Sequence, residues 1–272
     1  MNKFLKKLLE SNIDLVESND FENLYKLANK IGVSTELTVV LQQAGIDPLQ
    51  YMDKIPSRYA SGFTNYHFDI PDHITEIGDE AFMKSSLKEI TIKSACKRVR
   101  SSAFAYSNRL ETVNFESGCI KIDSGAFFNC SFLKTVNLPE TLLSLGESAF
   151  FEDYYLEQIK LPSFLAGIGR DCFGKCGLTE IFIPKSVTDI EARAFQGCSN
   201  LRKVTILGGD TIYNDVFRGC NKLESVMFGN DGSDFDDNIF DNENPPKHFY
   251  VPKTNQYVLD YCEKHNFNVH LI

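Results

Sequence analysis

The sequence lacks the short motifs that carry most enzyme chemistry. None of its five histidines belongs to a His-Glu-x-x-His pair, and the chain contains neither Gly-x-Ser-x-Gly nor a phosphate-binding loop. The Gly-Gly-Asp stretch at 208–210 is not followed by Gly-x-Gly-x-x-Gly, so it does not form a dinucleotide loop. We therefore expect a protein that is not an enzyme and that needs no cofactor.

Long apolar runs are also missing. No stretch of 18 apolar residues is present to span a membrane, and residues 1–20 contain lysines but no apolar run of seven, which a secretory signal would need. Because no export signal is visible, we expect the eight cysteines to be reduced thiols. The expected location is the cytoplasm, without contact to a membrane.

Basic surface is scarce as well. The formal net charge is −9, and residues 229–244 hold six acidic residues and no basic one. No basic stripe stands out, which argues against nucleic acid as a partner. The acidic residues within 231–243 are spaced like the oxygen ligands of a calcium loop, but the glycine and the distal glutamate of an EF-hand are missing. We favour a solvated loop there, and whether it binds calcium stays open.

What the sequence does contain is a repeat of 22 or 23 residues. Each unit has a phenylalanine, in most units after alanine or an aliphatic residue, and a Leu-x-x-Val/Ile-x-apolar pattern in constant phase. The second pattern marks nine expected strands between residues 67–70 and residues 247–251. The repeat phenylalanines are Phe82, Phe104, Phe127, Phe150, Phe173, Phe195, Phe217 and Phe240.

One unit of this kind cannot enclose a core, because its apolar side chains all point to one side. Stacked units bury each other's faces, so we expect a solenoid with parallel strands along one face and the phenylalanines stacked inside. A cysteine follows the phenylalanine by three residues in four units. A position used four times in a structural period indicates packing rather than catalysis, so we expect these thiols to be buried and reduced. They are Cys130, Cys176, Cys198 and Cys220.

The units resemble leucine-rich repeats of the BspA-like (Treponema pallidum) subclass. The matching segments are IPDHITEIGDEAF (70–82), LPETLLSLGESAF (138–150) and IPKSVTDIEARAFQGCSNLRKVTI (183–206). The resemblance covers residues 67–251 and weakens in the units that end at Phe217 and Phe240, where we expect an irregular convex side. It implies a repeat solenoid. Members of the subclass are mostly binding modules, many on cell surfaces, without shared catalytic residues, so it also implies a binding role.

Residues 1–60 do not fit the repeat and are predicted to be a small helical N-terminal domain. Asn19 and Glu22 are expected to form a capping box at the second helix, which Gly32 ends. The domain is either a cap on the first unit or a separate recognition domain. Two of its segments, DFENLYKLA and LQQAGIDPLQYMDKIPSRY, look similar to segments that precede such repeats in bacteriophage proteins, which points to a phage-encoded protein.

Residues 61–251 form the solenoid and residues 252–272 its expected C-terminal cap, with a helix from Thr254 to about Lys264 and then a strand. Cys262, His265 and His270 could suggest a zinc site, but they supply only three ligands, so we predict no metal.

Large apolar residues on the solvent side of a strand are informative, because folding does not require them. In the outward register the first strands carry small polar residues, whereas later strands carry Phe182, Met227 and Tyr250. We expect a protein partner to dock there, with an apolar centre and a charged rim. Alternatively, the C-terminal cap folds over Met227 and Tyr250. The predicted partner-binding residues are Lys160, Phe182, Lys203, Thr205, Met227 and Tyr250.

The favoured function is therefore a monomeric, non-enzymatic solenoid that binds a protein partner through its strand face. One alternative is a structural or assembly component of a virion. Another is a cell-surface adhesin, which would require an export signal outside this sequence.

Overall fold

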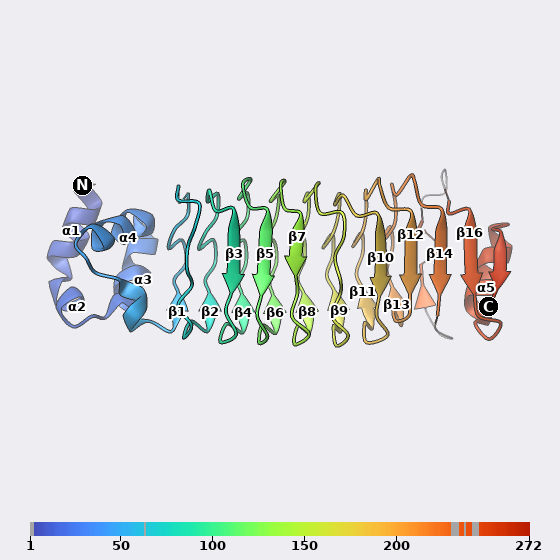
Figure 1. Ribbon diagram of the computed structural model, residues 1–272, viewed down its shortest axis with the longest axis horizontal. Coiled ribbons are helices and arrows are strands. Elements are labelled where there is room, and N and C mark those ends of the chain that lie inside the picture. Colours follow the sequence, from blue (N-terminus) through green and yellow to red (C-terminus); the bar gives the residue numbers. More distant parts are fainter. Residues whose placement is uncertain (1–2, 63, 230–233, 237, 241–244) are drawn as a thin grey trace.

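The repeats stack along one long axis, as their constant phase predicts (Figure 1). The computed structural model describes residues 3–62, 64–229, 234–236, 238–240 and 245–272. Helices lie at the N-terminal end, the rungs of the solenoid follow in sequence order, and a single helix lies at the C-terminal end (Figure 1). The predicted solenoid is therefore confirmed.

One side of the solenoid carries an unbroken parallel sheet of nine strands within the described residues. Each strand is two residues long and pairs with the strand of the next rung. Both units in which an irregular convex side was expected still join this sheet, because β13 pairs in register with β11 and β15 pairs in register with β13, so the expected irregularity does not reach these strands. The strands are β1 (Lys54–Ile55), β2 (Glu76–Ile77), β4 (Arg98–Val99), β6 (Lys121–Ile122), β8 (Ser144–Leu145), β9 (Gly167–Ile168), β11 (Asp189–Ile190), β13 (Thr211–Ile212) and β15 (Asp234–Phe235).

The other side carries the longer strands and is called the strand face below. Its strands are β3 (Glu89–Ile92), β5 (Thr112–Phe115), β7 (Thr135–Asn137), β10 (Glu180–Ile183), β12 (Lys203–Ile206), β14 (Ser225–Phe228), β16 (His248–Val251) and β17 (Val269–Leu271). Two of the nine expected segments, 67–70 and 156–161, form no strand, which corrects the prediction. The strand face is therefore divided into a three-stranded sheet, β3-β5-β7, and a five-stranded sheet, β10-β12-β14-β16-β17.

The repeat phenylalanines form the predicted inner stack. Neighbouring rings lie 5.2 to 5.6 Å apart between centroids and are nearly parallel. Each ring is at most 4% exposed. Because every ring fills the space between two others, the stack links all rungs from Phe82 to Phe240, including the rung where the strand face is interrupted.

The backbone around each phenylalanine explains how the turns stack. From Phe82 to Phe217, the residues two before and two after the phenylalanine have positive φ, and most of them are not glycine. At Phe82, the N–H groups of Glu80, Phe82 and Lys84 all donate to carbonyls of the next rung at 2.7 to 3.0 Å. The left-handed residues thus turn alternate N–H groups along the axis, and these hydrogen bonds offset the strain of the conformation.

The four cysteines of the repeat are buried and reduced, as predicted. Each thiol donates to the carbonyl of the repeat phenylalanine one rung earlier, with Sγ···O distances of 3.0 to 3.3 Å. Burial raises the pKa of Cys198 to about 12, so this sulfur is a thiol and not a thiolate at neutral pH. These cysteines are packing residues with a hydrogen-bond donor.

The helical N-terminal segment comprises α1 (Lys3–Ser11), α2 (Ile13–Glu17), α3 (Phe21–Ile31), α4 (Ser34–Gln43) and the 3₁₀ turn η1 (Pro48–Tyr51). Asp20, rather than Asn19, caps α3 by accepting from the N–H of Asn23, which corrects the predicted capping box. Asn19 cannot take that place because it has a left-handed φ of 58°. Gly32 ends the helix in the left-handed conformation, as expected.

Helix α4 packs on the first rung. The hydroxyl of Thr38 donates to the carbonyl of Tyr59 at 2.6 Å, and the ring of Tyr59 lies 5.7 Å from that of Tyr25 on α3. The buried apolar residues of the helices and of the rungs belong to one continuous core. The helices therefore cover the end of the solenoid, while a separate recognition role for residues 1–60 stays a hypothesis.

The C-terminal segment folds as expected into a helix, α5 (Gln256–Lys264), and the strand β17. Strand β17 extends the strand face by pairing with β16, and the ring of Phe267 stacks on that of Phe249 at 4.7 Å. Strand β17 therefore covers the edge of β16, the last repeat strand of the strand face. None of the described helices is long and apolar enough to cross a bilayer.

Candidate functional site

The interruption of the strand face lies at residues 157–161, between β7 and β10 (Figure 1). Ile159 occupies the inward position of this segment and is half-buried, whereas Val136 and Ile181 in the adjacent rungs are 6% and 3% exposed. The segment therefore does not settle onto the core as its neighbours do. The sequence LEQIKL matches the repeat as well as any other unit, so no signal in it marks the interruption.

Two grooves flank this segment on the strand face. One, of about 360 Å³, lies between the segment and β7, and the other, of about 420 Å³, lies between the segment and strands β10 and β12. The second groove brings together four of the six predicted partner-binding residues. It is lined by Gln158, Ile159, Lys160, Glu180, Ile181, Phe182, Lys203 and Thr205.

Phe182 is the largest apolar side chain of the second groove. It lies on β10 in the outward register and is 52% exposed. The sequence pattern predicts this position correctly. The half-buried Ile159 adds further apolar surface at the same place, which sequence reasoning missed because Ile159 occupies an inward position.

Charged groups stand at the rim of this groove. Lys160 has an 87% exposed side chain, and its Nζ lies 3.3 Å from a carboxylate oxygen of Glu140. That carboxylate also accepts from the N–H and the hydroxyl of Ser163, both at 2.9 Å, and the backbone bond is the largest cause of a lowered pKa for Glu140. Glu180 and Lys203 are register partners on β10 and β12.

Thr205 departs from its expected exposure. It lies in the outward register, but its side chain is only 6% exposed. The reason is its position between two larger residues, because Phe182 and Met227 are its register partners on the two adjacent strands. Thr205 therefore forms part of the groove floor rather than an exposed contact.

Met227 and Tyr250 lie outside the second groove and are both partly buried. The ring of Tyr250 stacks on His270 of β17 at 4.8 Å between centroids. The C-terminal cap therefore covers one side of Tyr250, which is the alternative that the sequence had left open for this residue. His270 also contacts His248, with 3.1 Å between ring nitrogens.

The N-terminal half of the strand face is polar, as expected. The side-chain amide of Asn137 donates to that of Asn114 across β5 and β7 at 2.7 Å. Neither residue offers an apolar anchor. Asn114, Asn137 and Phe182 occupy the equivalent outward position of their repeats, so the two halves of the strand face differ from polar to apolar at this position.

Other candidates are not assembled into sites. His265 stacks against Tyr261 and Phe267, whereas His270 lies against His248 and Tyr250, so these histidines have different neighbours. Across the described ranges, no group of three His, Cys, Asp or Glu side chains could hold a metal ion. Most of the acidic loop 231–243 lies outside the described residues, so calcium binding there stays untested.

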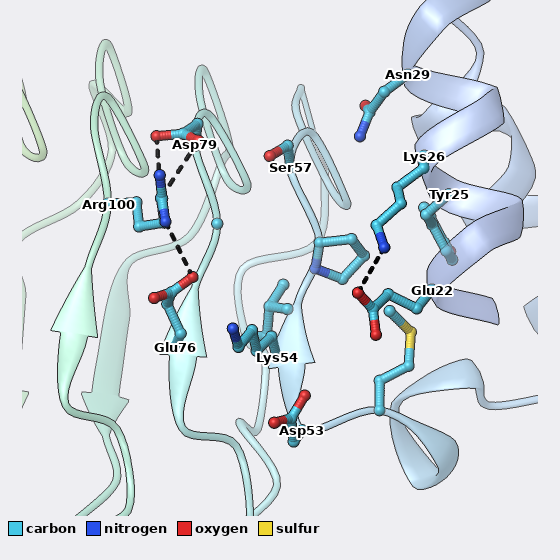
Figure 2. Close-up of a pocket in the computed structure, with 14 residues that line it drawn as sticks. Glu22, Tyr25, Lys26, Asn29, Asp53, Lys54, Ser57, Glu76, Asp79 and Arg100 are labelled. Carbon is cyan, nitrogen blue, oxygen red and sulfur yellow. Dashed lines mark hydrogen bonds and ion pairs between the residues drawn. The ribbon is translucent and has the colours of Figure 1, made fainter. Parts of the chain in front are cut away.

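A pocket that sequence reasoning missed lies where α3 meets the first rungs (Figure 2). It has a volume of about 180 Å³. Five of its charged residues pair with one another, since Arg100 contacts Glu76 and Asp79, and Lys26 lies 2.8 Å from Glu22 (Figure 2). Asp53 and Lys54 also line this pocket.

The repeat can now be assigned by comparison with known families. The family model for the BspA type leucine rich repeat region matches residues 54–176 and 147–269, which together span most of the chain. The chain belongs to the BspA-type leucine-rich repeat family. Repeats of this family are typically non-catalytic binding modules. No curated protein matches the chain significantly in sequence.

Two solved structures of leucine-rich proteins are similar in fold. The leucine-rich repeat protein of Treponema pallidum is 23% identical, with a TM-score of 0.52, over 67% of this chain and 85% of that one. A leucine-rich cell surface protein of Faecalibacterium prausnitzii is 21% identical, with a TM-score of 0.52, over 80% of this chain and 82% of that one. At these identities the similarity establishes the BspA-type fold alone.

Proposed function

We propose that this BspA-type protein is a non-enzymatic interaction module whose protein partner docks on the C-terminal half of the strand face. The observation that carries the proposal is the groove of about 420 Å³ with half-exposed Phe182 at its centre. Exposed aromatic residues in hollows are typical anchors of interfaces. Repeat proteins bind through such extended faces.

The groove also indicates what the partner presents. Phe182 and the half-buried Ile159 offer apolar surface, and the amines of Lys160 and Lys203 stand at its rim. A partner segment with an apolar side chain and a nearby carboxylate complements this arrangement. The apolar contact supplies most of the affinity, while the exposed lysines contribute mainly to association rate and orientation.

In this proposal the protein binds its partner as a monomer, and it does so in a reducing compartment. Eight buried, reduced cysteines support a reducing environment, because such thiols persist where disulfides are disfavoured. A cytoplasmic location is therefore retained as part of the proposal. The mass in solution separates it from the alternative of a structural or virion component, since large ordered oligomers would favour the latter.

The proposal is tested by mapping the contact before measuring its strength. A photo-crosslinking residue at position 182 should capture a protein from a host lysate that the same residue at position 137 does not capture. With that protein purified, Phe182→Ser should weaken binding about 30-fold, as expected for a hot spot worth about 2 kcal/mol. The triple variant Phe182→Ser, Met227→Thr, Tyr250→Thr should weaken it further.

The matched control is the double variant Asn114→Ala, Asn137→Ala in the N-terminal half, which should change the affinity less than about threefold. Equal affinity of the wild-type protein and the triple variant, both shown to be folded, would exclude the C-terminal strand face. The helical segment 1–60 would then be the next candidate.

A further inference from the structure

From Phe104 to Phe217, the third residue after each repeat phenylalanine belongs to a buried column, and most of these residues make the same hydrogen bond. Ser107 donates its hydroxyl to the carbonyl of Phe82 at 3.0 Å, and the four thiols described above donate to the equivalent carbonyls. The residue types differ, but each can donate a hydrogen. Between Ser107 and Cys220, the column has one member of another kind, Asp153.

Asp153 is completely buried, with 0% of its surface exposed. Its Oδ1 accepts from the backbone N–H of Cys130 at 2.8 Å. Its Oδ2 is also buried and meets no hydrogen-bond donor among the described residues. An ionised carboxylate would leave this oxygen both charged and unsatisfied, which is costly in an apolar interior.

Ser107 shows how the column solves the same problem two rungs earlier. Its hydroxyl accepts from the N–H of Ser85 at 3.2 Å and donates to the carbonyl of Phe82. Asp153 already makes the equivalent accepting bond. The carbonyl that corresponds to the donating bond belongs to Phe127, because each donor in the column reaches one rung back.

We propose that Asp153 is a neutral carboxylic acid in the folded protein, that its Oδ2–H donates to the carbonyl of Phe127, and that deprotonation weakens the rung as pH rises. The proton supplies the donor that a thiol or a hydroxyl supplies elsewhere in the column. The repeat thus carries one titratable link in an otherwise pH-insensitive column.

The groups that face Asp153 from the adjacent rungs support its neutral form. They are the thiols of Cys130 in the preceding rung and of Cys172 and Cys176 in the following rung, whose pKa values are raised by burial and to a lesser extent by Asp153. No cation of the described residues forms an ion pair with Asp153. Lys175 pairs instead with Glu152, the residue before Asp153. Burial raises the pKa of Asp153 well above its ordinary value.

The sign of the effect on stability follows from linkage. The carboxyl is protonated in the folded state at pH values where it is ionised in the unfolded chain, because its folded pKa is raised. Its stabilising contribution is complete below the unfolded pKa of about 3.9 and is lost as pH rises toward the folded pKa. Across this window the unfolding constant rises by up to about tenfold per pH unit relative to a non-titrating residue.

The test compares the pH dependence of unfolding of the wild-type protein with that of Asp153→Asn. Asparagine keeps the shape, the acceptor and the donor without a titrating proton. The two proteins should unfold similarly near pH 4, and the variant should be increasingly more stable toward pH 8. A second variant, Asp153→Cys, restores the common residue of the column and should gain stability with the same pH dependence.

Asp123→Asn is the matched control, because Asp123 is a nearly buried carboxylate that pairs with Arg98 at 2.7 Å and with Lys121. Its loss should lower stability at neutral pH. Carboxyl ¹³C resonances of labelled aspartate give a direct readout. One protonated signal at pH 7 should be present in the wild-type protein and absent from Asp153→Asn. An ionised Asp153 at pH 7, or a stability difference that is constant from pH 4 to 8, would overturn the proposal.

Discussion

The two sides of the solenoid treat the same rung differently. On one side β8 pairs with β9, so the sheet of short strands continues through the rung of Phe150. On the strand face the same rung forms no strand at 157–161. Continuity of the stack therefore does not depend on the strand face. The phenylalanine stack and the short strands hold adjacent rungs together, which leaves the strand face open to local variation at residues 157–161.

The largest expected effect comes from breaking the continuous side. Phe150→Ala should lower the free energy of unfolding by about 3–5 kcal/mol, because it removes a buried ring between Phe127 and Phe173. Chemical denaturation measures the change. Phe182→Ala, at an exposed position, serves as the control and should change stability by about 0.5 kcal/mol or less. A comparable loss in both variants would contradict the distinction between core and face.

A smaller effect sharpens the comparison along the strand face itself. Ile181→Ala should cost about 2–5 kcal/mol because Ile181 is buried, while Ile159→Ala should cost about half as much because Ile159 is half-buried. The same denaturation measurement applies to both variants. If the two substitutions lower the free energy of unfolding equally, residues 157–161 pack on the core like the other units. The missing strand would then not weaken the packing of this rung.

The smallest effect concerns the thiol column next to the phenylalanine stack. Cys198→Ser should change stability by about 1 kcal/mol or less, because serine keeps the donor to the carbonyl of Phe173. In the native protein, Cys130, Cys176, Cys198 and Cys220 should react with an alkylating reagent only at the rate of unfolding. Fast labelling of all four, followed by mass spectrometry, would show that the column is accessible.

The sequence predicts those features that depend on the repeat period. The phase of the phenylalanines predicts the stack, the common offset of Cys130 and Cys198 predicts buried thiols, and the outward register predicts the exposure of Phe182. These inferences succeed because one geometric rule applies to every rung. The family match and the solved structures agree with the fold that this rule implies.

Features that depend on a single rung could not be predicted in the same way. The segment 157–161 matches the pattern and yet leaves the ladder, because pairing also depends on how its two neighbours pack. Thr205 is buried by the size of its register partners, and Tyr250 is stacked by a histidine 20 residues further along the chain. Asp153 had a signal in its offset from Phe150, but its chemistry became visible only with its burial.

The constant repeat length also bears on how the chain folds. Paired residues of successive rungs are 22 or 23 positions apart, so each added rung closes a loop of nearly the same length and with nearly the same entropy. Folding can then spread from rung to rung, with each finished rung serving as a template for the next. At residues 157–161 the template lacks its strand ladder, so the next rung is joined to it through the short strands, the ring of Phe150 and the hydrogen bonds of the turn. We expect the folding front to cross this junction more slowly than the junctions between rungs that pair on both sides of the solenoid.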